Sequence, residues 1–330
     1  MMTPPIFLRT KRGFLAVLAA SVAGLVATGA YAASFPDRPI RMIVPYTAGG
    51  GSDLIARLIA KELESSLGQP VIVDNRGGAG GIVGQGAVAR SAPDGYTILF
   101  SGSGNLAISP FLFKALPYDS VRNFTPIALV ATGPMTIAIN ANVPAKDFSE
   151  FHKLAKSRAL NWASGGAGTT SHLSGVLAFN ASGLQLLHVP FNGTAPAVNA
   201  FRGRQVDAIV DTEAALAPFV DADKGFRAIA QLGTKRSELL PDIPTMRELG
   251  YDADASVWWG LLGPAKLPDE VRKTLNDAVN TAVLHSNFRE ALRKNGAVAA
   301  GGTPADFSQF LGTELKKWGA AVRAAGVEPQ

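Results

Sequence analysis

Glycine-rich loops that lie between a short apolar segment and a segment with helical periodicity constrain the fold of this chain more than any other feature. In the first of them, an apolar run at 40–45 ends in Pro45 and three consecutive glycines follow at 49–51. Apolar side chains then recur at three- and four-residue spacing, at Leu54, Ile55, Leu58, Ile59, Leu63 and Leu67. This spacing is typical of an amphipathic helix, and Ser52 stands where its N-cap is expected. The segment therefore predicts a strand, a glycine loop and a helix.

The same order of segments recurs along the chain. Short apolar segments predict further strands at 71–73, 96–100, 160–163, 186–189 and 206–210. Helical spacing predicts helices before residue 90 and at 148–156, 171–181, 195–201, 268–283, 288–294 and 307–318. Strands that alternate with helices indicate an α/β fold with a parallel sheet and right-handed crossovers. The length of 330 residues favours two domains.

The N-terminus has the composition of an export signal. Basic residues at 9, 11 and 12 precede an uncharged apolar run at 13–29, and Ala30 and Ala32 fit a signal-peptidase site. We therefore expect cleavage of residues 1–32 near Ala32 and Ala33, and a mature protein in the periplasm. The alternative is an uncleaved membrane anchor, because the run is close to the shortest that spans a bilayer. Export by the Sec or the twin-arginine route stays open.

Composition and motif spacing exclude several classes of function. Residues 1–32 hold three cations and no acid, so their removal lowers the formal charge from +5 to +2. No basic cluster interleaved with aromatic residues remains, and nucleic acid is not an expected partner. The chain has no cysteine, its four histidines lack metal-ligand spacing, and residues 78–84 only approach a dinucleotide fingerprint. We expect neither a metal nor a cofactor.

Two of the glycine loops are placed to bind an anion. The loops at 49–51 and 165–170 each precede a predicted helix, whose first N–H groups are unsatisfied and carry partial positive charge. Hydroxyl groups adjoin both loops, at Ser52, Thr169, Thr170 and Ser171. The alternative is that the glycines only form tight turns. Several such loops in one chain favour a shared anion site.

A catalytic alternative is an exported α/β hydrolase with Ser171 or Ser101 as nucleophile. A triad could be assembled only from scattered residues such as Ser171, His172 and Asp211. Adjacent residues of a helix point in different directions, which counts against Ser171 and His172 as partners.

Many segments of this chain match one known family. They lie at 35–45, 49–53, 67–76, 78–81, 92–97, 116–119, 168–173, 188–191, 235–236, 240–245 and 259–261. In these segments, which span the mature chain in order, the protein resembles the Bug family of periplasmic solute-binding proteins that serve tripartite tricarboxylate transporters.

The resemblance implies a two-domain periplasmic binding protein fold of the type II kind, with the ligand cleft between two α/β domains and no catalysis. Residues 33–138 and 232–330 would form one domain and residues 139–231 the other, with crossings near Ile139 and Gln231. The ligand would be a small organic carboxylate, held between the loops at 46–53 and 164–172. The partners would be the membrane subunits of the transporter, and the receptor itself would be a monomer. A sensor with the same fold is the alternative.

Carried onto this sequence, the resemblance assigns the ligand contacts to both domains. They are Tyr46, Ala48, Gly49, Gly50, Ser52, Asp53 and Ser101 of the first, and Ser164, Gly168, Thr169, Thr170, His172, Phe191 and Asp211 of the second. Asp211 would accept from an ammonium or amide of the ligand, or else cap the following helix. His172 would face the cleft or serve in packing or capping, and Trp258 and Trp259 would flank the cleft mouth or belong to the core.

One departure from the family pattern concerns the ligand. The segment at 191–193 reads Phe-Asn-Gly where the family often has Tyr-Lys-Gly, so a cation is missing, while Asp211 and Glu213 lie nearby in the proposed pocket. Citrate, with three negative charges, would face acidic residues without a cationic partner. The sequence therefore favours a monocarboxylate, or an amino-acid-like or amide-bearing carboxylate.

Overall fold

The computed structural model describes residues 1–2, 35–46, 48–49, 51–77, 81–216, 219 and 225–329. The expected signal peptide, apart from its first two residues, and the expected cleavage site lie outside this part of the chain, as does the candidate residue Gly50. Within it, no helix combines the length and the apolar character needed to cross a membrane.

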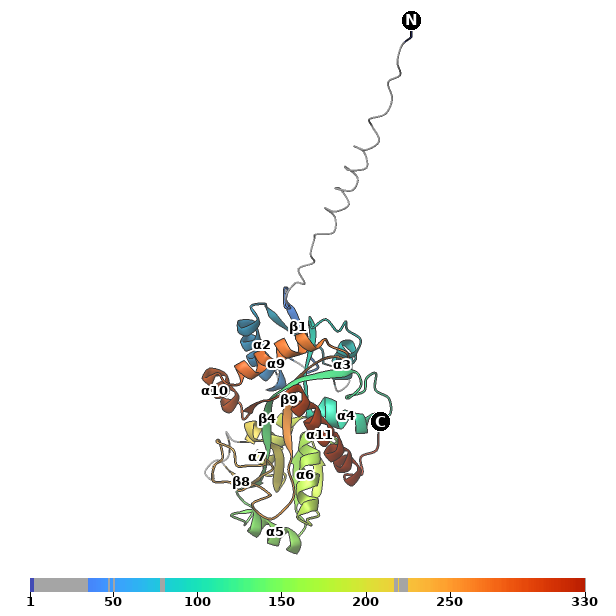
Figure 1. Ribbon diagram of the computed structural model, residues 1–330. Helices are drawn as coiled ribbons and strands as arrows, with labels where there is room; N and C mark the ends of the chain where they lie inside the picture. The colour runs from blue at the N-terminus through green and yellow to red at the C-terminus, as the bar shows by residue number, and fades with distance from the viewer. Residues whose placement is uncertain are drawn as a thin grey trace.

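The predicted α/β fold is confirmed in the upper lobe of Figure 1. Its first elements are β1 (Ile40–Val44), α2 (Gly51–Leu67), β2 (Val71–Asn75), α3 (Ile82–Ala89) and β3 (Thr97–Gly102). Strand β1 pairs in parallel with both β2 and β3. A π-helix at Gly104–Ile108 and α4 (Ser109–Leu112) follow. The glycine loop after β1 thus leaves the middle strand of a parallel unit.

The lower lobe repeats this arrangement. Its elements are α5 (Phe148–Ser157), β5 (Asn161–Ser164), α6 (Thr170–Ala181), β6 (Leu187–Pro190), α7 (Thr194–Arg202), β7 (Ala208–Thr212) and α8 (Glu213–Leu216). Strand β5 pairs in parallel with β6 and β7, as β1 does with its neighbours. The second glycine loop therefore also leaves the middle strand of a parallel unit.

The predicted parallel sheet is correct for the two repeated units but wrong for the centre of the sheet, which is antiparallel. The strand order is β2-β1-β3-β9-β4-β7-β5-β6, with β8 (Phe226–Gln231) and β10 (Val298–Gly301) paired to β4. Strand β4 (Phe124–Asn140) runs antiparallel to β9 (Ser256–Pro264) and to β7, β8 and β10. Sequence reading missed β4 because Pro126, Gly133 and Pro134 interrupt it, and such residues are depleted in central strands. The sheet shifts register next to Pro126, which accommodates the missing donor.

Strand β4 joins the two lobes. Its residues up to Pro134 pair with β9 and β10, and from Met135 onward they pair with β7 and β8. The change of partners, between Pro134 and Met135, comes four to five residues before the crossing expected near Ile139. The exact division of the chain into two domains stays a prediction.

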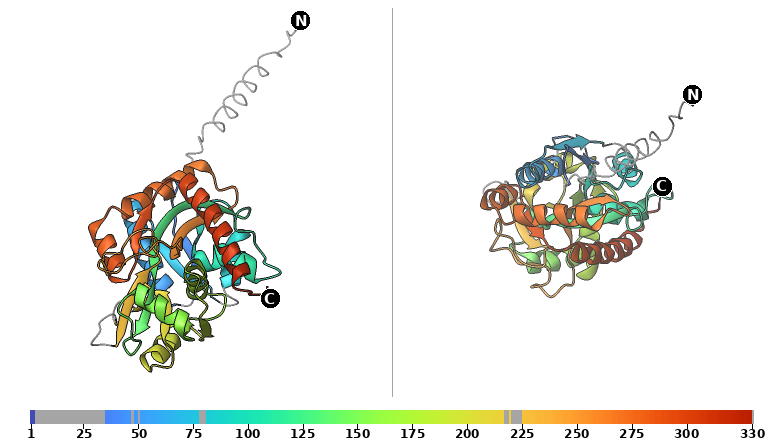
Figure 2. Two further views of the ribbon diagram at one scale, coloured as in Figure 1. Left: turned by 90° about the horizontal axis from the view of Figure 1, so that it is seen from below. Right: turned by 45° about the horizontal axis from the view of Figure 1, so that its top comes forward.

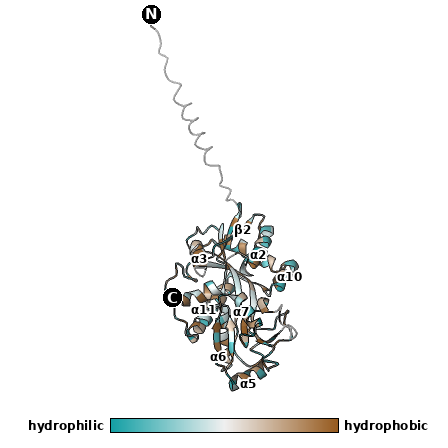
Figure 3. Cartoon of the chain, turned by 180° about the vertical axis from the view of Figure 1, so that it is seen from behind, coloured by the Kyte–Doolittle hydropathy of each residue, from teal (hydrophilic) through white to brown (hydrophobic). Residues whose placement is uncertain are grey.

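Helices cover both faces of the sheet. The C-terminal helices are α9 (Asp269–Ala282), α10 (Ser286–Lys294) and α11 (Pro304–Ala324); α9 and α11 both pack on β4, as the views of Figure 2 show. In Figure 3, α10 carries both hydrophilic and hydrophobic residues, consistent with an outer helix that buries Phe288 and Leu292.

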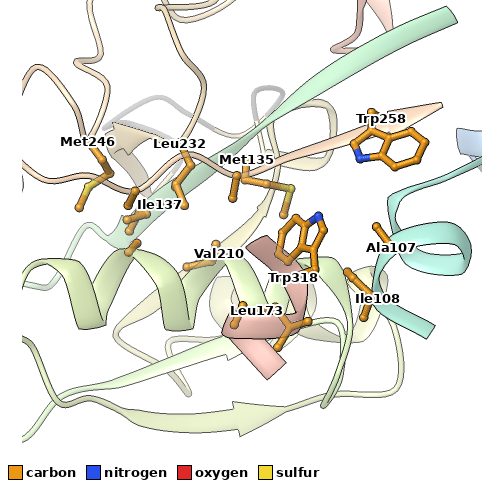
Figure 4. Packing of buried hydrophobic residues seen from close by; sticks show 14 of the residues in the cluster. Ala107, Ile108, Met135, Ile137, Leu173, Val210, Leu232, Met246, Trp258 and Trp318 are labelled. Carbon is orange, nitrogen blue, oxygen red and sulfur yellow. The ribbon is translucent and has the colours of Figure 1, made fainter. Parts of the chain in front are cut away.

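One hydrophobic cluster extends through both lobes. Figure 4 shows Trp318 of α11 among Met135, Leu173 and the π-helix residues Ala107 and Ile108. Trp258 and Trp259 of β9 are 0% and 8% exposed, so they belong to the core and not to a cleft mouth.

A buried carboxylate lies beside this cluster. Glu314 Oε2 accepts a hydrogen bond of 2.7 Å from the indole N–H of Trp258 and another of 2.7 Å from that of Trp318.

Candidate ligand-binding site

The loop after β1 is organised by Asp53 and not by the predicted cap Ser52. Helix α2 begins at Gly51, so Ser52 already lies inside its first turn. The hydroxyl of Ser52 accepts a hydrogen bond of 2.9 Å from the indole N–H of Trp259. Asp53 Oδ2 accepts from the backbone N–H of Gly49 at 2.9 Å, which closes the loop onto the helix. The prediction that Ser52 is the N-cap was therefore wrong, because Ser52 is the second residue of the helix.

Both carboxylate oxygens of Asp53 accept hydrogen bonds from the protein itself. Asp53 is 4% exposed, and besides Gly49 it accepts from Arg57 Nε at 3.1 Å and Asn75 Nδ2 at 2.9 Å. Burial alone would raise the pKa of Asp53, but these hydrogen bonds and the Arg57 charge lower it below the ordinary value. Asp53 is thus an ionised group that shapes the loop. Ala48 and Gly49 of the same loop are exposed.

Tyr46 and Ser101 are brought together beneath this loop. The hydroxyl of Tyr46 is hydrogen-bonded to Ser101 and to the Gly102 backbone, yet burial dominates and raises the pKa of Tyr46 to about 12. Tyr46 is therefore a neutral phenol. Ser101 is fully buried and accepts from Gln85 Nε2 at 3.0 Å. Gln85 was missed in the sequence, where nothing in its helical segment distinguishes it from a surface residue.

In the second loop, side chains satisfy most of the backbone. Thr169 is the N-cap of α6, and its hydroxyl accepts from the N–H of His172 at 3.3 Å. The N–H of Gly165 donates to Ser171 Oγ at 2.9 Å, and that of Gly168 donates to His172 Nδ1 at 3.1 Å. The loop therefore holds its own shape.

Three N–H groups at the start of α6 remain available. Those of Ala167, Thr170 and Ser171 have no hydrogen-bond partner among the residues that the structure describes. Ala167 is exposed and Thr170 is partly exposed. Unpaired N–H groups at a helix N-terminus, where the helix dipole is positive, attract an anion. This part of the loop can accept a carboxylate.

Other candidates of the lower lobe are buried behind the loop. Ser164 is fully buried, His172 is 6% exposed and Asp211 is 2% exposed. The side chain of Phe191 packs against a core cluster. Sequence reasoning missed His188, whose Nε2 lies 2.7 Å from Ser164 Oγ. Strands were predicted at 160–163 and 186–189, and their parallel pairing, which sets His188 opposite Trp162 two residues before Ser164, is the signal that could have placed the two close together.

Asp211 is bonded within the lower lobe. It accepts from Thr194 Oγ1 at 3.0 Å and from the N–H of Thr212 at 2.7 Å, and burial raises its pKa. The donors are Thr194 of α7 and Thr212, the residue that follows Asp211. In the described part of the chain, Asp211 therefore accepts no hydrogen bond from the residues of α8. Glu213 accepts from Ser237 Oγ at 2.7 Å, and burial also raises its pKa.

The geometry does not assemble a catalytic triad. Ser171 Oγ lies within hydrogen-bond distance of the Gly165 N–H and Thr169 Oγ1, and Asp211 is bonded to Thr194 and Thr212. Among the described residues, no hydrogen bond joins His172 to either Ser171 or Asp211. Three cavities of about 270, 610 and 300 Å³ lie elsewhere and include none of the candidate residues. The first of these lies between Glu213, Ser237 and α10.

Two repeated units, each with a helix N-terminus behind a parallel strand, give the chain a two-lobed α/β architecture. The family model of the tripartite tricarboxylate transporter family receptor matches residues 55–327. This chain belongs to that family. The resemblance to the Bug proteins is confirmed: Protein BugT of Bordetella pertussis is 33% identical over 307 residues, which cover 92% of this chain and 94% of BugT.

Solved structures agree with this assignment. An R. palustris protein with adipate has 29% identity and a TM-score of 0.77, over 90% of this chain and all of that chain. MatC of Rhodopseudomonas palustris with bound malate has 33% identity and a TM-score of 0.72, over 87% of this chain and all of that chain. The family and its structural neighbours are periplasmic solute-binding proteins, and some of them hold carboxylates.

Proposed function

We propose that this protein captures a small organic carboxylate in the periplasm and presents it to the membrane subunits of a tripartite transporter. The observation that carries the proposal is the set of unpaired N–H groups of Ala167, Thr170 and Ser171 at the start of α6. The loop between β1 and α2 supplies the matching helix N-terminus of the upper lobe. Carboxylates bound to the two related structures support the same class of ligand.

The proposal includes how the protein is processed and how it moves. Cleavage near Ala32 and Ala33 releases a monomer whose two lobes, 33–138 with 232–330 and 139–231, close on the ligand. N-terminal sequencing of protein from the periplasmic fraction tests the cleavage, and a start elsewhere contradicts it.

Within the carboxylates, we infer a monocarboxylate or an amino-acid-like or amide-bearing ligand in preference to citrate. Asn192 supplies no cation, and the buried acids Asp211 and Glu213 disfavour additional negative charge in the lower lobe. Titration calorimetry with lactate, malate, adipate, citrate, glutamate and glutamine tests the preference. Tightest binding of citrate would refute it. Native mass spectrometry of the protein as purified tests it independently, because a retained ligand is identified by its mass.

A proline substitution tests the α6 site directly. Thr170 is the first residue of α6, a position that tolerates proline because its N–H has no helical partner, and Thr169 before it is already extended. Thr170→Pro therefore removes one free N–H and leaves the helix intact. Since a hydrogen bond to a charged group contributes about 1.5–3 kcal/mol, the affinity should fall by about tenfold or more.

The matched control is Thr170→Ala, which keeps the N–H and removes only the hydroxyl. We expect Thr170→Ala to bind the best probe of the six with nearly wild-type affinity, and both variants to melt near the wild-type temperature. Wild-type affinity in a folded Thr170→Pro variant would show that the carboxylate does not use this helix N-terminus.

A further inference from the structure

Two histidines are stacked behind the α6 loop. His172 of α6 and His188 of β6 have ring centroids 4.0 Å apart and planes inclined by 16°. Trp162 of β5 adjoins both imidazoles, with its ring centroid 4.5 Å from that of His188 and 6.0 Å from that of His172. The stack joins three elements of the lower lobe and fixes the orientation of both imidazoles.

Each imidazole holds one point of the loop. His172 Nδ1 accepts from the N–H of Gly168 at 3.1 Å, so Nδ1 carries no proton. His188 Nε2 lies 2.7 Å from Ser164 Oγ, and Ser164 Oγ accepts from the N–H of Gly166 at 3.2 Å. The two rings thereby fix both ends of the segment 164–168.

This segment needs such support because its backbone is permissive. Gly166 and Gly168 have φ of 134° and 74°, in the region that favours glycine. A glycine-rich turn without fixed contacts samples many conformations, and the entropy of ordering it would weaken any ligand bound to it. The free N–H groups of Ala167 and Thr170 depend on the conformation that the histidines hold.

We propose that His172 and His188 are positioning residues of the carboxylate site, which as neutral rings fix the 164–168 loop, and that a proton on His172 Nδ1 releases it. This inference rests on the proposed function. A protonated Nδ1 would point an N–H at the N–H of Gly168. His188 has no such conflict, because its Nε2 can donate to or accept from a hydroxyl.

The surroundings of the rings agree with a neutral resting state. Trp162, Ser164, Gly168 and the other imidazole face them, and no carboxylate forms an ion pair with either ring in the described part of the chain. Burial lowers the pKa of His172, and burial together with the neighbouring His172 lowers that of His188 to about 4. Both rings are therefore uncharged at neutral pH.

Matched substitutions separate the acceptor from the stack. His172→Asn places an amide oxygen near the position of Nδ1, whereas His172→Phe keeps an aromatic ring and removes the acceptor. With the tightest-binding of the six probes at pH 7.5, we expect His172→Phe to lose at least tenfold in affinity and His172→Asn less than threefold. At position 188, we likewise expect His188→Phe to lose more affinity than His188→Gln. His152→Asn, on α5, is the control for a histidine outside the loop.

The dependence on pH is the readout that a purely structural role would not change. Between pH 7.5 and 5 the wild type should lose affinity, and His172→Asn should not, after correction with the same probe for its own ionisation. The inference would be overturned if a folded His172→Phe variant bound with wild-type affinity. It would also be overturned if His172→Asn lost affinity between pH 7.5 and 5 as the wild type does.

Amide exchange supplies a test without ligand. We expect the N–H of Gly168 to exchange at least tenfold faster in His172→Phe than in wild type, with the interior of α6 unchanged. Unchanged exchange at Gly168 would refute the positioning role. Failure of the wild type to bind any of the six probes would instead refute the proposed function, and the exchange measurement would still decide the role of the histidines.

Discussion

Alanine at Gly168 should destabilise the protein through two separable effects. Gly168 has φ of 74°, which costs a residue with a Cβ about 1–2 kcal/mol. A Cβ there would also lie 2.9 Å from Leu112 Cδ1 of α4, which comes from the upper part of the fold. Overpacking of this kind costs about 1–3 kcal/mol. We expect Gly168→Ala to lower the free energy of unfolding by about 2–5 kcal/mol.

A double-mutant cycle distinguishes the two contributions. Leu112→Ala removes the side chain that the new Cβ would meet, so the double variant should recover the packing part and retain the backbone part. Urea unfolding of the wild type, both single variants and the double variant gives the coupling energy, expected to be about 1–2 kcal/mol in favour of the double variant.

Additive effects would refute the contact between Gly168 and Leu112. If the loss of stability in the double variant equals the sum of the losses in the two single variants to within about 0.5 kcal/mol, the two residues are not in contact. If Gly168→Ala is as stable as wild type, neither the contact nor the positive φ describes this loop in solution.

Three further predictions concern buried carboxyl groups. Asp53→Ala should cost about 1–3 kcal/mol in urea unfolding, because the N–H of Gly49 loses its acceptor, and a stable variant would contradict the role of Asp53 in the loop. Glu314→Leu should cost about 2–6 kcal/mol, because two buried indole N–H groups lose their acceptor. Glu314→Gln should cost clearly less, and equal losses would argue against those hydrogen bonds. Because burial raises the pKa of Asp211, its contribution to stability is present at low pH and declines as pH rises through that pKa. Asp211→Asn should therefore be at least as stable as wild type at pH 7.5 and lose this advantage near pH 4, whereas a constant difference across pH would contradict the shift.

Local patterns predicted the repeated units of the fold well. The strand, glycine loop and helix at 40–67 could be predicted because each depends on neighbouring residues: apolar runs, glycines and three- to four-residue spacing. Strand β4 could not be predicted, because its partner strands lie at least 69 residues further along the chain, the separation of Ile139 from Ala208. It also contains two prolines, which are tolerated only at the bulge and at the change of partners. The antiparallel centre of the sheet was missed for the same reason.

For the site, the sequence predicted the loops but not the role of each residue in them. Asp53 and Thr169 were correctly placed near helix starts, yet their oxygens serve the loop backbone. Which N–H donors stay unpaired depends on the full network of hydrogen bonds, and this network cannot be predicted from local sequence patterns. The unpaired N–H of Ala167 and the support from His188 emerge only from three-dimensional contacts.

The position of β9 between β3 and β4 has a consequence for the order in which this polypeptide can acquire its structure. The strands at Thr97–Gly102 and Phe124–Asn140 are separated in the sheet by a strand that ends at Pro264. Until that strand has been synthesised, two long backbone edges have no partner, and such edges promote association between chains. Contacts across this sequence distance also slow folding. Fragments that end before residue 256 should therefore aggregate, and a full-length nascent chain should complete its upper lobe only near the end of its synthesis.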